Sequence, residues 1–159
     1  MKGLKHHEYS LAIERFRKWK KEGFKGADAG LPELLEELTR IPQVIPLWSC
    51  IGHPDRPGSQ PYITFGVKNG DAPGRYADEI MEEIFVSGIL KFEYGLMVAP
   101  WHEDEDYIMA EDMLEFTIPT FTIRGTVMGD DVEQNKMAKE LFISNIQSII
   151  MKLEAYTGS

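Results

Sequence analysis

Apolar side chains recur every three or four positions in four stretches of the chain, which is the spacing of one face of an α-helix. The pattern predicts helices over 8–21, 31–38 and 73–87. It also predicts a longer last helix that begins at 129–131 and carries an apolar stripe as far as Leu153. Pro32 suits the first turn of the second helix, and Gly88 suits the end of the third.

Runs rich in β-branched and aromatic residues predict strands over 44–48, 62–67 and 89–98, and one strand or two short ones over 113–127. Pro119 lies within this last run, so we expect an edge, a bend or a break there. The resulting order, ααββαββα, is typical of an α+β fold with the helices packed on one face of a mostly antiparallel sheet. No glycine-rich phosphate fingerprint is present, so the fold is expected to be non-Rossmann.

The length of 159 residues fits one domain with its own core. Within it we expect a basic N-terminal helix and linker (1–29) and an α+β core (30–159). A single cysteine, Cys50, cannot form an internal disulfide, and no apolar run is long enough to cross a bilayer. We therefore expect a cytoplasmic protein with no membrane partner.

Charge is unevenly distributed along the chain. The net charge is −9, yet residues 1–25 contain eight Lys or Arg against three Glu, so the remainder is strongly acidic. An acidic protein is a poor general surface for tRNA, which disfavours that partner, although the basic helix could contact phosphates locally. The simpler interpretation of the basic stretch is a solvated helix face.

The densest group of reactive side chains is the loop between the first two strands. Ser49, Cys50, His53 and Arg56 fall within eight residues, at the end of an apolar strand. Cys50 and His53 have the spacing of two zinc ligands, but the sequence contains no second Cys/His pair. We therefore predict no metal site and interpret the two as a half-buried cysteine and a loop histidine.

Cys50 could also be a nucleophile with His53 as its base, but the sequence identifies no residue to orient the histidine, so the catalytic residues stay unknown. Trp48, Tyr62 and Trp101 are candidates to stack on a flat ligand. The acidic loop 103–106 lacks the ligand spacing of a calcium loop and is interpreted as solvated surface.

Three short motifs give the chain a resemblance to a known family. Ser49-Cys50-x-Gly52 in a loop after a strand, Ser87-Gly88-Ile89 at a helix end, and Ile123-Arg124-Gly125-Thr126 in a later strand resemble the tRNA wybutosine-synthesis methyltransferase family, the third enzyme of that pathway. The resemblance implies a small non-Rossmann fold that uses S-adenosylmethionine on a tRNA guanosine, with Arg124 near the site. His53 stands where that family has Arg, and Ile51 replaces its second Ser, with Arg56 as a displaced cation.

Three functions remain open from the sequence. The first is binding, with or without sequestration, of a small adenosine-containing nucleotide-like ligand by Trp48, Ser49, Cys50, Gly52, His53, Arg56, Tyr62, Trp101 and Arg124, a role that viral proteins of this size class also perform. The second is an S-adenosylmethionine-dependent methyltransferase acting on tRNA or a nucleobase, which requires the basic N-terminal helix to lie beside the 49–56 loop. The third is a structural protein with a protein partner, and a homo-oligomer stays open. The first requires no cofactor.

Overall fold

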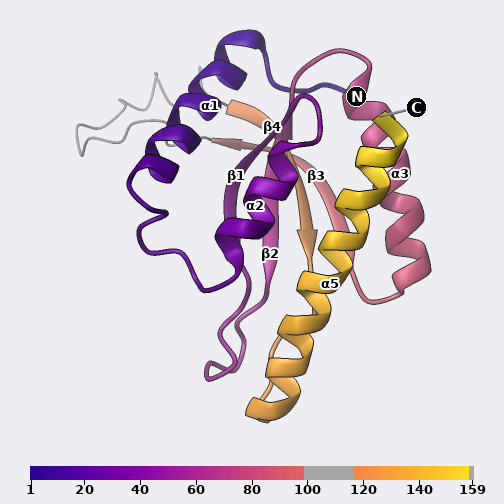
Figure 1. Cartoon of the computed structure of the whole chain (residues 1–159). Helices are drawn as coiled ribbons and strands as arrows, with labels where there is room; N and C mark the ends of the chain where they lie inside the picture. Colours follow the sequence, from indigo (N-terminus) through magenta and orange to yellow (C-terminus); the bar gives the residue numbers. More distant parts are fainter. Residues whose placement is uncertain (99–116, 158–159) are drawn as a thin grey trace.

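The structure is a computed structural model that describes residues 1–98 and 117–157. Its elements, in order, are α1 (His6–Lys21), α2 (Leu31–Thr39), β1 (Val44–Cys50), β2 (Tyr62–Val67), α3 (Ala72–Ser87), β3 (Lys91–Val98), β4 (Thr117–Arg124) and α5 (Val132–Thr157) (Figure 1). The predicted order and the α+β class are confirmed. The first strand continues through Cys50, two residues further than predicted, so Ser49 and Cys50 belong to the strand itself.

The four strands form one antiparallel sheet in the order β1-β2-β4-β3. β1 and β3 are therefore the two edges, and β2 and β4 form the centre. Pro119 is opposite Leu96 of β3, in an inner strand, and not in one of the two edge strands of the sheet. The pairing of β4 with β2 covers only Phe121 to Arg124, so at Pro119 the strand pairs with β3 alone and the expected edge is local.

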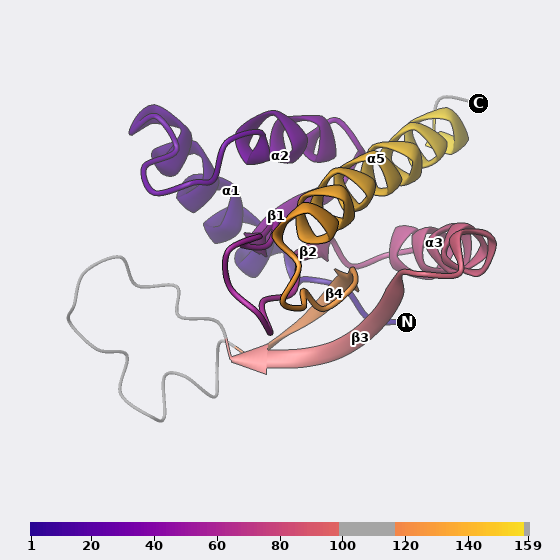
Figure 2. The same cartoon turned by 90° about the horizontal axis from the view of Figure 1, so that it is seen from below.

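Side chains on one face of the sheet pack against α2, α3 and α5, which form a layer on that side (Figure 2). Alternation along β2 and β4 directs Ile63, Phe65, Phe121 and Ile123 into this layer. The rings of Phe65 and Phe121 are 5.5 Å apart, and Phe142 of α5 is 2% exposed among them. This is the main hydrophobic core.

Helix α1 differs from the prediction that all helices share one face. Its Ala12 is buried with Leu4, Ile45 and Ile118, in a smaller cluster of its own. Ile45 is opposite Gly66, which alternates with Phe65 and so faces away from the main core. α1 therefore packs on the opposite face, and Figures 1 and 2 show it at the β1 side of the sheet, away from α3 and α5. Its apolar stripe could not reveal which face it would cover.

Local chemistry explains where the helices begin and end. The Lys5 backbone N–H donates to the Glu8 carboxylate at 2.8 Å, which starts α1 two residues earlier than the apolar spacing predicted. Gly88 adopts a left-handed φ of +70° and ends α3. Among the helices that the structure describes, none is long and apolar enough to span a membrane.

Candidate functional site

The site predicted at the end of β1 borders a cavity of about 780 Å³. Its walls come from α1, the 22–30 segment, the start of α2 and the outer edge of β1. A cavity of this size matches the clefts that hold metabolite-sized ligands, which range over roughly 300–1,000 Å³.

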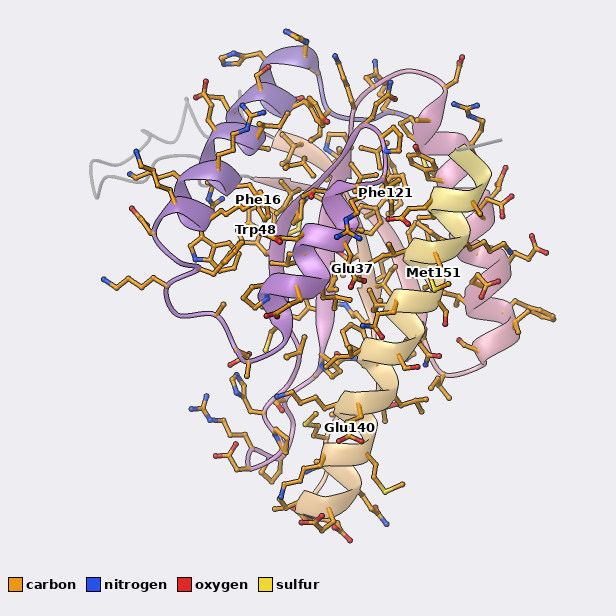
Figure 3. All side chains as sticks on the ribbon, viewed as in Figure 1. Phe16, Glu37, Trp48, Phe121, Glu140 and Met151 are labelled. Atoms are coloured by element: carbon orange, nitrogen blue, oxygen red, sulfur yellow. The ribbon has the colours of Figure 1, made fainter. Side chains whose placement is uncertain are left out.

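One wall of the cavity is aromatic. Phe16, Trp19 and Trp48 line it, and Figure 3 labels Phe16 and Trp48 in the region of α1 and β1. Trp19 packs edge-on against Phe16 and against Phe24 of the following segment, with ring centroids 6.4 and 4.9 Å apart. Aromatic side chains provide large apolar surfaces with few rotatable bonds, so this wall suits a flat ligand.

The charged residues that line the cavity carry a slight positive balance, unlike the protein as a whole. They are the cations Arg15, Lys18 and Lys25 and the acids Glu22 and Asp28. The guanidinium carbon of Arg15 is 5.9 Å from the ring centroid of Trp48, a cation–π arrangement that keeps the positive charge beside the aromatic wall. A local cationic cluster can attract an anion even though the chain has a net charge of −9.

Cys50, His53 and Asp28 meet at one end of the cavity. The Cys50 Sγ and His53 Nε2 atoms are 3.6 Å apart, and a carboxylate oxygen of Asp28 lies within 4.8 Å of both. The Gly52 backbone N–H donates to the Cys50 sulfur at 3.4 Å. All three side chains are half-buried and line the cavity, so this group is accessible to a ligand.

A β-bulge decides which side chains of β1 face α1. Pro46 is opposite Phe65 and Trp48 is opposite Thr64, so Leu47 is an extra residue in β1. Because side chains alternate along a strand, this insertion moves Trp48 and Cys50 to the face that α1 covers. Without it, Trp48 would point toward the main core.

The loop that follows β1 is held by hydrogen bonds at several points. The Ser59 hydroxyl donates to the His53 carbonyl at 3.0 Å and accepts from the His53 N–H at 3.1 Å. The amide of Asn135, a 4% exposed residue of α5, donates to the carbonyls of Pro54 and Gly129. These bonds fix the backbone that carries His53.

The 22–30 segment is anchored as well. The indole N–H of Trp19 donates to the Lys25 carbonyl at 3.0 Å, and the Leu31 N–H donates to the Asp28 carbonyl at 3.1 Å. Phe24 has a positive φ of 56°, which is uncommon for a non-glycine residue and is accompanied here by its contact with Trp19. Asp28 therefore lines the cavity from a segment that hydrogen bonds and ring contacts hold in place.

The structure groups some of the predicted site residues and separates others. Trp48, Ser49, Cys50 and His53 line the cavity, and Gly52 contacts Cys50 through its backbone. Arg56 is exposed and is not among the lining residues.

Two other predicted site residues, Tyr62 and Arg124, form a separate pair. They are opposite each other in β2 and β4, and the Arg124 guanidinium carbon lies 5.6 Å from the Tyr62 ring centroid. Arg124 also forms an ion pair with Glu93 at 3.3 Å. Neither residue lines the cavity. Trp101 and the acidic loop 103–106 lie outside the described residues.

Several cavity residues carried no functional signal in the sequence. Asp28 lies in a glycine-containing connection between two helices, and nothing local marks it as a partner for Cys50 and His53. Asn135, which does not line the cavity but holds the loop that carries His53, was not singled out either. Arg15 and Lys18 belong to the basic N-terminal helix, whose charge was recognised although its position was not. Only the folded structure brings these residues close to β1, because at least one helix separates them from that strand in the sequence.

Comparison of the chain with models of protein families, with curated proteins and with solved structures finds no match. The resemblance to the wybutosine-synthesis methyltransferases stays a prediction.

Proposed function

We propose that this protein binds a small, flat, anionic ligand of the nucleotide class, an adenosine-containing metabolite or signal, in the cavity between α1 and β1. The observation that carries the proposal is the cavity lining. One wall is aromatic, three of the five charged lining residues are cations, and a cluster of hydrogen-bonding side chains lies at one end. A nucleotide has the matching parts, namely a base with two π faces, a phosphate and a polar sugar.

The cation–π contact supports a specific orientation of this ligand. Arg15 is held over Trp48, so an incoming phosphate would meet the guanidinium at the α1 side of the cavity. The base would then lie along the wall formed by Phe16 and Trp19. Ser49 and His53 would be within the cavity to recognise the sugar or the base edge.

Thermal unfolding with a ligand panel tests the proposal. The panel contains linear and cyclic adenine nucleotides, S-adenosylmethionine and its demethylated product. Ligand at about 100 times its dissociation constant adds roughly 2.7 kcal/mol to the free energy of unfolding, so the Tm should rise by about 5–10 °C for a chain of this length. A panel that leaves the Tm unchanged contradicts the proposal and favours the structural alternative.

Matched variants locate the binding site. Arg15→Gln and Trp48→Leu should abolish the Tm increase, because they remove the cation and the aromatic wall. Arg17→Gln makes the same change of charge on an exposed side chain of the same helix that does not line the cavity, and should leave the Tm increase intact. Equal loss in Arg15→Gln and Arg17→Gln would place binding elsewhere.

A second candidate function is an S-adenosylmethionine-dependent methyltransferase. One observation favours it: Arg15 and Lys18 of the basic helix line the same cavity as Ser49 and Cys50, which is the arrangement that this hypothesis required. The same panel separates the two candidates. A Tm increase with the methyl donor and its product, but not with nucleotides, would put the methyltransferase first.

A further inference from the structure

We propose that Asp28, Cys50 and His53 form a mononuclear zinc site with an open coordination position that faces the cavity. The inference does not depend on the proposed nucleotide ligand, because it rests on the donor atoms of these three side chains. The sequence offered only two of them, with a spacing that is incomplete as a zinc motif. The fold adds the third from a segment more than twenty positions earlier in the chain.

The separation of the cysteine and histidine atoms fits the metal. Zinc–sulfur and zinc–nitrogen bonds of about 2.3 and 2.0–2.1 Å at a tetrahedral angle place the two donors about 3.6 Å apart. The Cys50 Sγ and His53 Nε2 atoms are 3.6 Å apart. A thiol–imidazole hydrogen bond would have a similar length, so this pair does not by itself distinguish the two interpretations.

The position of Asp28 favours the zinc site over a simple thiol–imidazole hydrogen bond. Its carboxylate oxygen lies within 4.8 Å of both other donors, so a modest rotation of one side chain would bring all three into the coordination sphere of one ion. A cysteine, a histidine and an aspartate supply one sulfur, one nitrogen and one oxygen donor, a set suited to zinc. Magnesium and calcium prefer oxygen donors throughout. Three protein donors leave the fourth position of a tetrahedral zinc for water or a ligand group.

A backbone hydrogen bond holds the Cys50 sulfur in place. The Gly52 N–H donates to the Cys50 Sγ atom at 3.4 Å. Gly52 has a positive φ of 87°, which lets the chain turn back on the cysteine within two residues. The Ser59 and Asn135 hydrogen bonds hold the rest of the loop, so the site is largely built before an ion arrives.

The experiment uses the full chain without nucleotide. Protein stripped with a chelator is titrated with zinc and, separately, with cobalt as a spectroscopic substitute. We expect one equivalent to bind, the Tm to rise, and cobalt to give a sulfur-to-metal charge-transfer band. Because Cys50 is the only cysteine in the chain, such a band identifies the Cys50 sulfur as a ligand of the metal. Absence of the band, or an equal Tm increase with magnesium, would overturn the inference.

Variants test each ligand. Cys50→Ser should eliminate the cobalt–thiolate band. Asp28→Asn and His53→Gln should weaken zinc binding by roughly 100-fold or more, since loss of an outer-shell partner alone typically costs 10- to 100-fold. Asp55→Asn is the matched control, because this exposed carboxylate of the same loop is not part of the cluster. Unchanged zinc affinity in Asp28→Asn would overturn the three-ligand site.

Alkylation of Cys50 provides a test on the unmodified chain. Bound zinc should slow the reaction of the thiolate with iodoacetamide, and a chelator should restore it. A rate that zinc does not alter contradicts the inference and favours a free thiol beside a histidine, as in a nucleophilic dyad. If zinc binds but nucleotides do not change the Tm, the zinc site is supported and the proposed nucleotide-binding function is contradicted.

Discussion

The two faces of the sheet are built differently. On one face, α2, α3 and α5 enclose a continuous apolar core around Phe65, Phe121 and Phe142. On the other face, α1 buries a much smaller cluster, and buried threonines replace many of the apolar side chains. The cavity and the Asp28, Cys50 and His53 group lie beside this second layer.

This difference separates the source of stability from the source of chemistry. A continuous core supplies most of the hydrophobic free energy and positions the strands rigidly. A thin layer at a sheet edge leaves space for a ligand and for polar side chains that a dense core would exclude. Substitutions in the two layers should therefore have different consequences.

The largest expected effect is in the main core. Phe142→Ala should lower the free energy of unfolding by about 3–5 kcal/mol, because it removes a 2% exposed ring and leaves a cavity. Leu141→Ala, at the neighbouring and 49% exposed position of the same helix, should change it by less than about 0.5 kcal/mol. Chemical denaturation measures both. Similar losses in the two variants would contradict the described orientation of α5.

The next effect is at the turn after Cys50. Gly52→Ala should cost about 1–2 kcal/mol for the left-handed backbone conformation, and the new methyl group would also meet the end of Met128 at 2.5 Å. Gly58→Ala has almost the same φ, +86°, and no neighbour within 4 Å, so it carries the backbone cost alone. We expect Gly52→Ala to be the more destabilising of the two by denaturation, and to be the one that impairs zinc binding.

An effect of comparable size tests the polar burial on the α1 face. The hydroxyls of Thr64 and Thr122 are 2.9 Å apart and both residues are buried. Thr64→Val alone should cost roughly 1–3 kcal/mol, since the Thr122 hydroxyl loses its partner. The double variant Thr64→Val/Thr122→Val should recover most of that loss. A double-mutant cycle with purely additive losses would show that this pair is not coupled.

The smallest effect concerns the surface of the main layer. Lys152 of α5 lies 3.1–3.5 Å from the carboxylates of Glu79, Glu82 and Glu83 of α3. Hydrogen bonding to Glu83 raises the pKa of Lys152 above its ordinary value of 10.5. A raised lysine pKa stabilises the fold below pH 10.5, and this contribution is lost as the pH rises through the folded-state value.

Lys152→Met should therefore lower the Tm slightly at neutral pH, and its difference from the natural chain should shrink above pH 10.5. Lys136→Met is the control, because Lys136 pairs only with Glu133 of its own helix among the contacts the structure gives it. A difference that grows with increasing pH would contradict the assigned pKa direction.

Periodicity and residue type together were enough to place the elements. Four apolar stripes and four β-prone runs marked every helix and strand of the described chain to within a few residues, because a buried face imposes a spacing of 3.6 or 2 on the sequence. Glycines and prolines located several of the ends. The reactive loop after β1 was also visible, since its side chains are neighbours in sequence.

Only the tertiary structure decided which side of the sheet α1 covers and which groups meet Cys50. An apolar stripe specifies that a helix packs, but both faces of a sheet can receive it. The extra residue at Leu47 shifts the alternation of β1 by one position, which the composition of the strand does not reveal. Asp28 joins Cys50 and His53 because a helix connection folds over the sheet edge, a proximity determined by packing across more than twenty residues.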